Sequence, residues 1–202
     1  MTLFCIGRNY ADHAKELNNP IPQNPIVFCK PATAILRDNK PFFIPDFSQN
    51  IHYEVELLLR ISKSGKKISE SKAMEFVSHI GLGIDFTARD LQDQCKAKGH
   101  PWEISKSFDH SAVIGDWMEI SKLGKDPVNF SLLKNKETVQ NGNSMDMIFN
   151  FNQLICHISQ YFTLMQGDII FTGTPAGVGP VKSGDLLEGF IGAQRMFWTE
   201  IK

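Results

Sequence analysis

The stretch His52-Tyr53-Glu54-Val55-Glu56 runs directly into the apolar residues Leu57-Leu58-Leu59. In a β-strand alternate side chains share a face, so the two glutamates would point to one side together with His52. Two like charges about 4 Å apart repel by roughly 4 kcal/mol at an effective dielectric near 20, and a bound divalent cation removes that penalty. Oxygen ligands favour a hard ion, so the pair indicates Mg²⁺ or Mn²⁺. A half-exposed strand with its charges outside is the commoner explanation for such a pair taken alone.

Composition narrows the class of protein. With 202 residues and 42% hydrophobic content, we expect one domain over residues 1–202 with a substantial core. The net charge of −1 argues against a nucleic-acid surface held by bulk charge. No apolar run approaches the roughly 20 residues of a membrane span, and the first residues are too short and uncharged for a signal peptide. The cysteines form no C-x-x-C pair, so neither a zinc motif nor a disulfide framework is indicated, and we expect a reducing cytoplasm.

A second informative stretch follows between residues 80 and 98. Ile80–Asp85 predicts a strand that ends at an acidic residue, and Thr87 is a plausible N-cap for a helix over residues 88–98. Arg89 and Gln92 are three residues apart, so they share one face of that helix. Arginine binds carboxylates through paired hydrogen bonds, and glutamine can hold a carbonyl or hydroxyl group. A site for a metal and an anionic substrate is one interpretation, and a capped helix with surface charges is the other.

The N-terminal region contains a candidate acid–base pair. Residues 11–17 predict a short helix on which His13 and Glu16 lie three residues apart and can meet. A glutamate beside a histidine can orient the imidazole and raise its basicity. The turn-rich residues 18–25 follow, so residues 11–25 are a candidate mobile lid. From the pattern alone, an ordinary charged pair on a surface helix is the commoner reading.

Two lysines and one loop complete the candidates. Lys106 lies among aromatic and apolar neighbours in the sequence, where its pKa could be lowered, although a snorkelling lysine is the ordinary alternative. Lys30 ends the predicted strand Ile26–Cys29 and could face a pocket, although a solvated lysine is more common there. The loop Thr172–Gly179, which includes Thr174, can offer backbone N–H groups and hydroxyls to an oxyanion or carboxylate.

The rest of the chain predicts a mixture of strands and helices. The sequence favours an edge strand over residues 41–47, a helix around residues 73–77 capped by Ser69 or Ser71, and strands over residues 112–120 and 128–140. Residues 141–143 predict a turn. A further helix begins near Phe151, with a buried stripe formed by Leu154, Ile155, Ile158 and Phe162.

Taken together, these stretches resemble the fumarylacetoacetate hydrolase family, most of all its small single-domain members. The resemblance rests on six segments in the family's order, which are residues 7–13, 28–31, 52–56, 85–90, 106–109 and 172–179. It implies a β-rich α+β fold, a mixed β-sandwich roll, a single catalytic domain and a homodimer. The departures are peripheral: Lys134-Asn135-Lys136 replaces a Val-Asn-Gly-type hairpin turn, and the C-terminal tail is short.

The resemblance also implies roles for individual residues. Glu54, Glu56 and Asp85 are expected to bind Mg²⁺ or Mn²⁺. The residues expected to contact the substrate are Arg89, Gln92, Lys106 and Thr174. His13 and Glu16 are expected to form a lid dyad that activates water, and Lys106 to take part in catalysis.

The implied substrate is a 2-oxo acid whose carboxylate and 2-carbonyl chelate the metal, which stabilises an enolate. Proton loss from C3 gives tautomerisation, loss of CO₂ gives decarboxylation, and attack of water on a 4-carbonyl gives hydrolysis. We therefore expect an oxaloacetate keto–enol tautomerase, an acylpyruvate hydrolase or an oxaloacetate decarboxylase. An isomerase or hydrolase of aromatic catabolism, acting on a fumarylpyruvate- or fumarylacetoacetate-like substrate, is the alternative. A non-catalytic metal-binding module is a third reading.

Overall fold

The structure is a computed structural model that describes residues 1–17, 19–124 and 126–202. Asn18, within the predicted lid, lies outside the described residues. The strands are β1 Leu3–Gly7, β2 Ile26–Lys30, β3 Ile35–Leu36, β4 Ile51–Tyr53, β5 Val55–Ile61, β6 Val77–Asp85, β7 Thr87–Ala88, β8 Ala112–Glu119, β9 Asn129–Lys134, β10 Glu137–Asn143, β11 Ile169–Phe171, β12 Gly179–Pro180, β13 Leu186–Ile191 and β14 Gln194–Glu200. The α-helices are α1 Ala11–Glu16, α2 Arg89–Lys98, α3 Glu103–Lys106 and α4 Phe151–Tyr161, and the 3₁₀ helices are η1 Ala32–Ala34, η2 Glu70–Phe76, η3 Ile120–Lys122 and η4 Ser144–Asp146.

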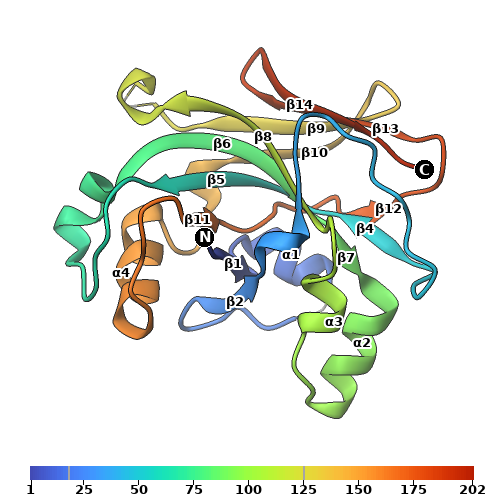
Figure 1. Ribbon diagram of the computed structural model, residues 1–202, viewed down its shortest axis with the longest axis horizontal. Coiled ribbons are helices and arrows are strands. Elements are labelled where there is room, and N and C mark those ends of the chain that lie inside the picture. The colour runs from blue at the N-terminus through green and yellow to red at the C-terminus, as the bar shows by residue number, and fades with distance from the viewer. Residues whose placement is uncertain (18, 125) are drawn as a thin grey trace.

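The strands form three sheets. A seven-stranded sheet has the order β2-β1-β11-β5-β6-β8-β3, a four-stranded sheet the order β10-β9-β13-β14, and a three-stranded sheet the order β12-β4-β7. The long strands β5 and β6 curve through the centre, the four-stranded sheet lies above them, and α4 lies at the end opposite α2 and α3 (Figure 1). The predicted β-rich α+β fold is confirmed. Within the described residues, no helix is both long enough and apolar enough to cross a membrane.

The leucine run of β5 is buried on both faces of the seven-stranded sheet. Leu57 and Leu59 belong to the main hydrophobic cluster, whereas Leu58 belongs to the smaller cluster on the opposite face. A strand covered on both faces reads as a continuous apolar run, as this one does. The neighbouring strand β6 needs a glycine, because a Cβ added at Gly83 would lie 2.2 Å from the carbonyl oxygen of Val113. The backbones of β6 and β8 therefore approach each other closely at this position.

Three segments of the chain meet at one end of the inner strands of this sheet. β11 pairs with β5, and β5 pairs with β6. The single residue Glu54 separates β4 from β5, β6 ends at Asp85, and the glycine- and threonine-rich loop follows β11. Acidic residues and loop amides that are distant in the sequence therefore meet at one place.

Helix α4 begins with a complete capping box between Asn150 and Gln153. It buries three side chains of the predicted stripe: Leu154, Ile155 and Ile158. The prediction for Phe162 was wrong, because this residue follows the last helical turn and remains 43% exposed, with its ring 5.3 Å from that of Phe4.

Two other local predictions were wrong. Residues 41–47 do not form a strand; Phe42 makes one isolated bridge with Ile201, and Pro41 and Pro45 lack the N–H groups that a ladder needs. The segment around residues 73–77 is the 3₁₀ helix η2, and its N-cap residue Ser69 makes no side-chain capping bond.

The prediction of a turn at residues 141–143 was also wrong, whereas the hairpin turn between β9 and β10 lies within residues 134–136, where the family resemblance places one. The chain reverses at Asn135 and Lys136, whose φ angles are 55° and 73°. Two successive residues with positive φ are typical of the tight turns that join antiparallel strands. Residues 141–143 continue β10 instead, where Asn141 pairs with Ser131.

Candidate active site

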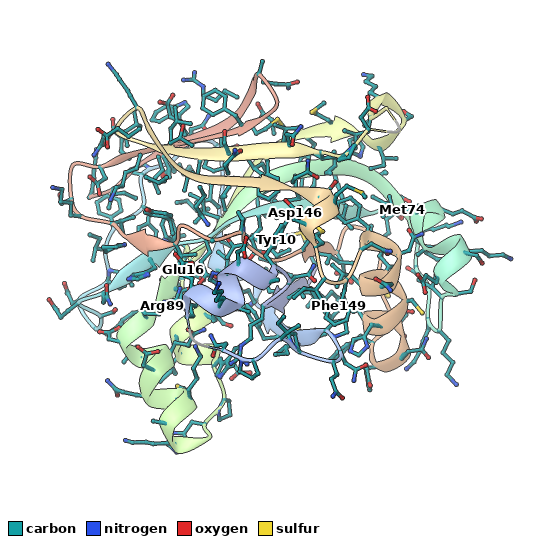
Figure 2. The ribbon with its side chains drawn as sticks, turned by 180° about the vertical axis from the view of Figure 1, so that it is seen from behind. Tyr10, Glu16, Met74, Arg89, Asp146 and Phe149 are labelled. Atoms are coloured by element: carbon teal, nitrogen blue, oxygen red, sulfur yellow. The ribbon has the colours of Figure 1, made fainter. Side chains whose placement is uncertain are left out.

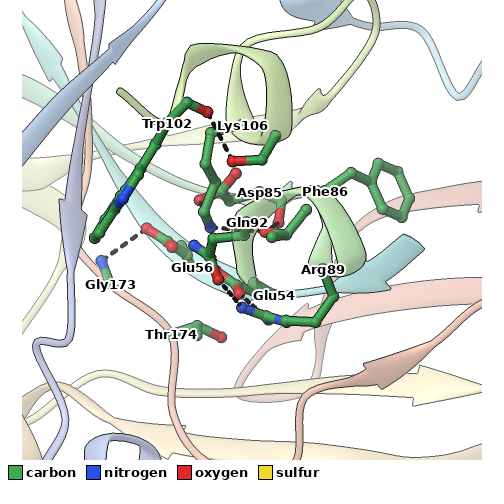
Figure 3. Close-up of polar contacts among 12 residues, drawn as sticks. Glu54, Glu56, Asp85, Phe86, Arg89, Gln92, Trp102, Lys106, Gly173 and Thr174 are labelled. Carbon is green, nitrogen blue, oxygen red and sulfur yellow. Dashed lines mark hydrogen bonds and ion pairs between the residues drawn. The ribbon is translucent and has the colours of Figure 1, made fainter. Parts of the chain in front are cut away.

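Three carboxylates converge at this end of the inner strands. Glu54, Glu56 and Asp85 are 4%, 2% and 1% exposed, and one oxygen atom of each lies within 4.8 Å of the others. They come from the β4–β5 junction, from β5 and from the end of β6 (Figure 3). The prediction that the two glutamates turn inward, and not to solvent, agrees with this burial.

Lys106 of α3 lies between two of these acids. Its Nζ is 2.7 Å from Glu54 Oε2, 2.7 Å from Asp85 Oδ2 and 2.7 Å from the hydroxyl of Thr87. The expectation of a lowered lysine pKa was wrong: burial favours the neutral amine, but Asp85 and Glu54 raise the pKa of Lys106 above its usual value. Lys106 is therefore an ammonium group, a donor of protons and hydrogen bonds.

The two buried glutamates differ in their ionisation. Burial favours protonation of Glu54, but Lys106 and Arg89 hold its pKa far below the usual range. Burial, Asp85 and Glu54 all raise the pKa of Glu56 well above its usual value. Lys106 and the Gly173 amide only partly oppose this rise, and Glu56 has no ion pair of its own among the described residues.

Helix α2 brings Arg89 and Gln92 to the same cluster. Arg89 forms an ion pair with Glu54, and its Nη1 donates to Gln92 Oε1 at 2.6 Å. The helix begins at Arg89 with Ala88 as its N-cap, so the predicted capping role of Thr87 was wrong. Thr87 belongs to β7, and its hydroxyl faces Lys106 instead.

The loop after β11 supplies amides and a hydroxyl. The N–H of Gly173 donates to Glu56 Oε2 at 2.7 Å. The φ of Gly173 is +101°, and a Cβ there would lie 2.6 Å from the Cβ of Asn9, so only glycine fits. The hydroxyl of Thr174 accepts a hydrogen bond from the buried Gln140 at 2.9 Å.

The predicted dyad is present on α1. His13 Nδ1 lies 3.2 Å from Glu16 Oε2, and Glu16 Oε1 accepts a hydrogen bond from the N–H of Gly177 at 3.0 Å. Burial lowers the pKa of His13, although Glu54 and Glu16 partly oppose this effect. Seen from behind, Glu16 and Arg89 lie on the side of the molecule away from Met74 (Figure 2).

One cavity of about 30 Å³ collects these groups. Its lining includes eight of the nine predicted residues: His13, Glu54, Glu56, Asp85, Arg89, Gln92, Lys106 and Thr174. The ninth, Glu16, reaches it through His13. A larger and mainly apolar groove of about 880 Å³, beside Phe47 and Ile104, contains no comparable cluster of charged groups. We therefore take the small cavity as the candidate active site.

Several residues of the site were missed or undervalued. Lys30 is fully buried, and its Nζ lies 2.7 Å from Asp85 Oδ1 and 2.9 Å from the hydroxyl of Ser111. The only signal was its position between a strand and Pro31, which solvated lysines share. Arg8 and Lys96 also line the cavity. Arg8 lies in segment 7–13 of the family resemblance but was given no role, and Lys96 has the sequence context of a surface lysine.

The donor set of the cluster suits a hard divalent cation. Three buried carboxylates, with oxygen atoms within 4.8 Å of one another, supply only oxygen ligands, as Mg²⁺ and Mn²⁺ prefer. A cation at the three oxygens would also relieve the repulsion that raises the pKa of Glu56. The residues present therefore fit a divalent metal ion.

Comparison with known proteins agrees with the geometry. Residues 2–195 match the family described as fumarylacetoacetate (FAA) hydrolase C-terminal. The chain is 42% identical over 191 residues to the mitochondrial oxaloacetate tautomerase FAHD1 of Bos taurus, covering 94% of this chain and 86% of that protein. It is 39% identical to the oxaloacetate tautomerase YcgM of Escherichia coli K12, covering 92% and 85%.

A solved structure shares the fold throughout. The fumarylpyruvate hydrolase of Pseudomonas aeruginosa, crystallised with Mn²⁺ and pyruvate, superposes with a TM-score of 0.94 at 36% identity. The match covers 100% of this chain and 89% of that one. The chain belongs to the fumarylacetoacetate hydrolase family.

Proposed function

We propose that this protein is a Mg²⁺- or Mn²⁺-dependent enzyme that interconverts the keto and enol forms of oxaloacetate or a close 2-oxo acid. The observation that carries this proposal is the buried cluster of Glu54, Glu56 and Asp85 beside Arg89 and Lys106. Relatives about 40% identical over more than nine-tenths of the chain are named oxaloacetate tautomerase, which supports the choice of reaction.

Each group has a part in binding or proton transfer. Glu54, Glu56 and Asp85 would hold the metal ion, which when bound polarises the substrate 2-carbonyl and stabilises negative charge on its oxygen. Arg89 and Gln92 bind the substrate carboxylate and a neighbouring oxygen. Thr174 and the loop amides limit where the substrate can lie.

Tautomerisation moves one proton from C3 to the carbonyl oxygen. If Nδ1 of His13 donates to Glu16, Nε2 keeps its lone pair and can accept the C3 proton. The ammonium of Lys106 can donate a proton to the oxygen, and reversal of both transfers restores the keto form. The lowered pKa of His13 favours the neutral imidazole that this base needs.

Hydrolysis of an acylpyruvate is the second candidate, and the formed His13–Glu16 dyad specifically favours it. Attack on a 4-carbonyl requires a base that takes a proton from water, and a carboxylate-oriented histidine is such a base. The related solved structure is named a fumarylpyruvate hydrolase. Decarboxylation of oxaloacetate shares the same enolate but needs no activated water.

The oligomeric state and the cellular compartment of the protein are also proposed. The family resemblance supports a homodimer that acts on a small molecule, without a nucleic-acid or membrane partner. All four cysteines are free, which supports a reducing compartment such as the cytoplasm. The related bovine protein is named mitochondrial, and the other relative is bacterial.

One substrate panel tests the proposal. Enol oxaloacetate, keto oxaloacetate, acetylpyruvate and fumarylpyruvate are each assayed with Mg²⁺, with Mn²⁺ and after EDTA treatment. We expect metal-dependent tautomerisation of oxaloacetate to exceed both cleavage reactions. If cleavage exceeds tautomerisation, acylpyruvate hydrolysis replaces tautomerisation as the proposed function. Metal binding without turnover of any 2-oxo acid would leave only the non-catalytic reading.

A further inference from the structure

Two cations of the cavity have no role in the site described so far. Arg8 and Lys96 line the same cavity as the acidic cluster. The cavity's other two cations, Arg89 and Lys106, are both paired with acids of the cluster. Among the described residues, neither Arg8 nor Lys96 forms an ion pair. They are therefore the positive charges available to a ligand.

Trp102 lines the same cavity as these two cations. A Cβ added at Gly7, the residue before Arg8, would lie 3.5 Å from the Trp102 ring. The Nζ of Lys96 lies 6.0 Å from the centre of the same ring. Arg8 has a φ of 61°, which is strained for a residue with a side chain and is frequent at binding sites.

Lys96 lies further along α2 than the two residues that are expected to bind the substrate beside the metal cluster. Arg89, Gln92 and Lys96 lie three and then four residues apart, so they form one stripe along the helix. Lys96 is about 6 Å further along the helix axis than Gln92. A ligand held by Arg89 and Gln92 at one end can thus reach Lys96 with its other end.

The charges around Lys96 favour binding of an anion between Lys96 and Arg8. Burial, Arg89 and Arg8 lower the pKa of Lys96, and the exposed Asp93 only partly opposes them. Two cations brought together in a partly buried position repel each other, and a bound carboxylate would relieve that repulsion.

We propose that Arg8 and Lys96 form a second anion subsite, which binds the distal carboxylate of a dicarboxylate 2-oxo acid. The subsite selects oxaloacetate-like dicarboxylates over monocarboxylates such as acetylpyruvate. This inference rests on the proposed function, because it assumes that the other end of the substrate lies at the acidic cluster.

Binding of unreactive ligands tests the subsite without turnover. Malate and lactate are 2-hydroxy acids of which only malate carries a distal carboxylate, and both are titrated calorimetrically in the presence of Mg²⁺. We expect the wild type to bind malate more tightly than lactate. Lys96→Met and Arg8→Met should each weaken malate binding by roughly ten- to a hundredfold and leave lactate binding unchanged.

Matched variants separate charge from fold. Lys98→Met removes an exposed lysine from the same helix and should change nothing, and Lys96→Arg should retain most of the preference for malate. Thermal unfolding of each variant checks its fold. A wild type that binds malate no better than lactate overturns the proposal, as does an equal loss of both ligands in Lys96→Met.

Turnover then separates this inference from the proposed function. For oxaloacetate, Lys96→Met should raise KM more than it lowers kcat, whereas the 4-ethyl ester of oxaloacetate, which lacks the distal negative charge, should react equally with the variant and the wild type. Absence of oxaloacetate turnover in the wild type, with the malate preference intact, refutes the tautomerase proposal and leaves the anion subsite standing.

Discussion

The floor and the cover of the cavity are built in different ways. The floor, which we define as Glu54, Glu56 and Asp85, lies on or beside paired central strands and is braced by buried cations. The cover is the six-residue helix α1 with His13 and Glu16, and its last residue is tied by one hydrogen bond to Gly177. The floor suits the binding that all candidate reactions share, whereas the cover carries the groups that can determine which reaction follows.

The largest effect is expected from the floor. Glu56→Gln keeps the size of the side chain and an acceptor for the Gly173 amide but removes one metal-binding charge. We expect loss of metal-dependent turnover of every substrate and much weaker Mg²⁺ binding by calorimetry. The metal-free variant should be as stable as the wild type or more stable, because one buried like charge is gone.

Glu75→Gln is the matched control, because Glu75 is an exposed residue of η2. It should retain full activity. Metal-stimulated turnover at the wild-type level in Glu56→Gln would falsify the assignment of the floor as the metal site.

Removing the base of the cover should divide the reactions. His13→Ala is expected to lower acylpyruvate cleavage by about 10²- to 10⁴-fold, the usual contribution of a general base. Tautomerase activity should fall less, since solvent can still take up the C3 proton and Lys106 still donates to the carbonyl oxygen. Calorimetric Mg²⁺ affinity should not change. A parallel loss of all activities would show that no other base replaces His13 in tautomerisation and that the cover does not choose between reactions.

The contribution of Lys30 to holding the floor together can be measured as a change in the free energy of unfolding. Lys30→Met removes one of the two buried lysine partners of Asp85 and should cost about 3–5 kcal/mol, the usual effect of breaking a buried ion pair, because Asp85 is left with Lys106 alone. For a domain of this size the melting temperature should fall by roughly 6–20 °C. Lys63→Met, which breaks an exposed pair with Glu75, should cost at most about 1 kcal/mol. Equal melting temperatures for the two variants would contradict the bracing role.

The floor could be predicted from sequence because its residues break a local pattern. Two glutamates inside an apolar strand and an aspartate at the end of another have no place in an ordinary core, and their alternation fixes the face they share. The burial of Glu54, Glu56 and Asp85 agrees with that inference. The loop after β11 was expected to offer backbone N–H groups to an oxyanion or carboxylate, and the N–H of Gly173 donates to the carboxylate of Glu56.

The remainder depends on tertiary contacts that leave no local trace. A lysine at the end of a strand has the same sequence context whether it is solvated or, like Lys30, paired with an acid 55 positions away. The hairpin turn at Asn135 and Lys136 lacks the glycine that usually marks such turns. The sequence context of Lys106 suggested a lowered pKa, but the pKa is raised by acids that only the fold brings near.

Contacts between the floor and α2 should give an intermediate effect on kinetics. Arg89→Ala removes one charge-assisted contact to the substrate, a loss of about 1.5–3 kcal/mol, or roughly ten- to a hundredfold in kcat/KM. It also leaves Glu54 with one cation fewer. Lys98→Ala on the same helix is the control. Unchanged kinetics of Arg89→Ala on every active substrate would exclude its role in binding.

The smallest effect is expected in the pH dependence of the cover. Burial lowers the pKa of His13, so the acid limb of kcat/KM for cleavage should lie below the ordinary histidine value of about 6.5. Glu16 raises that pKa, and Glu16→Gln should therefore move the limb to still lower pH. In the unfolded chain His13 takes up a proton more readily, so the wild type should lose stability relative to His13→Ala as the pH falls from about 6.5 towards the lowered pKa. Activity and denaturation profiles of the three proteins between pH 4 and 8 test both signs. An acid limb above pH 6.5, or one that moves to higher pH in Glu16→Gln, would contradict the assignment of His13 as the neutral base.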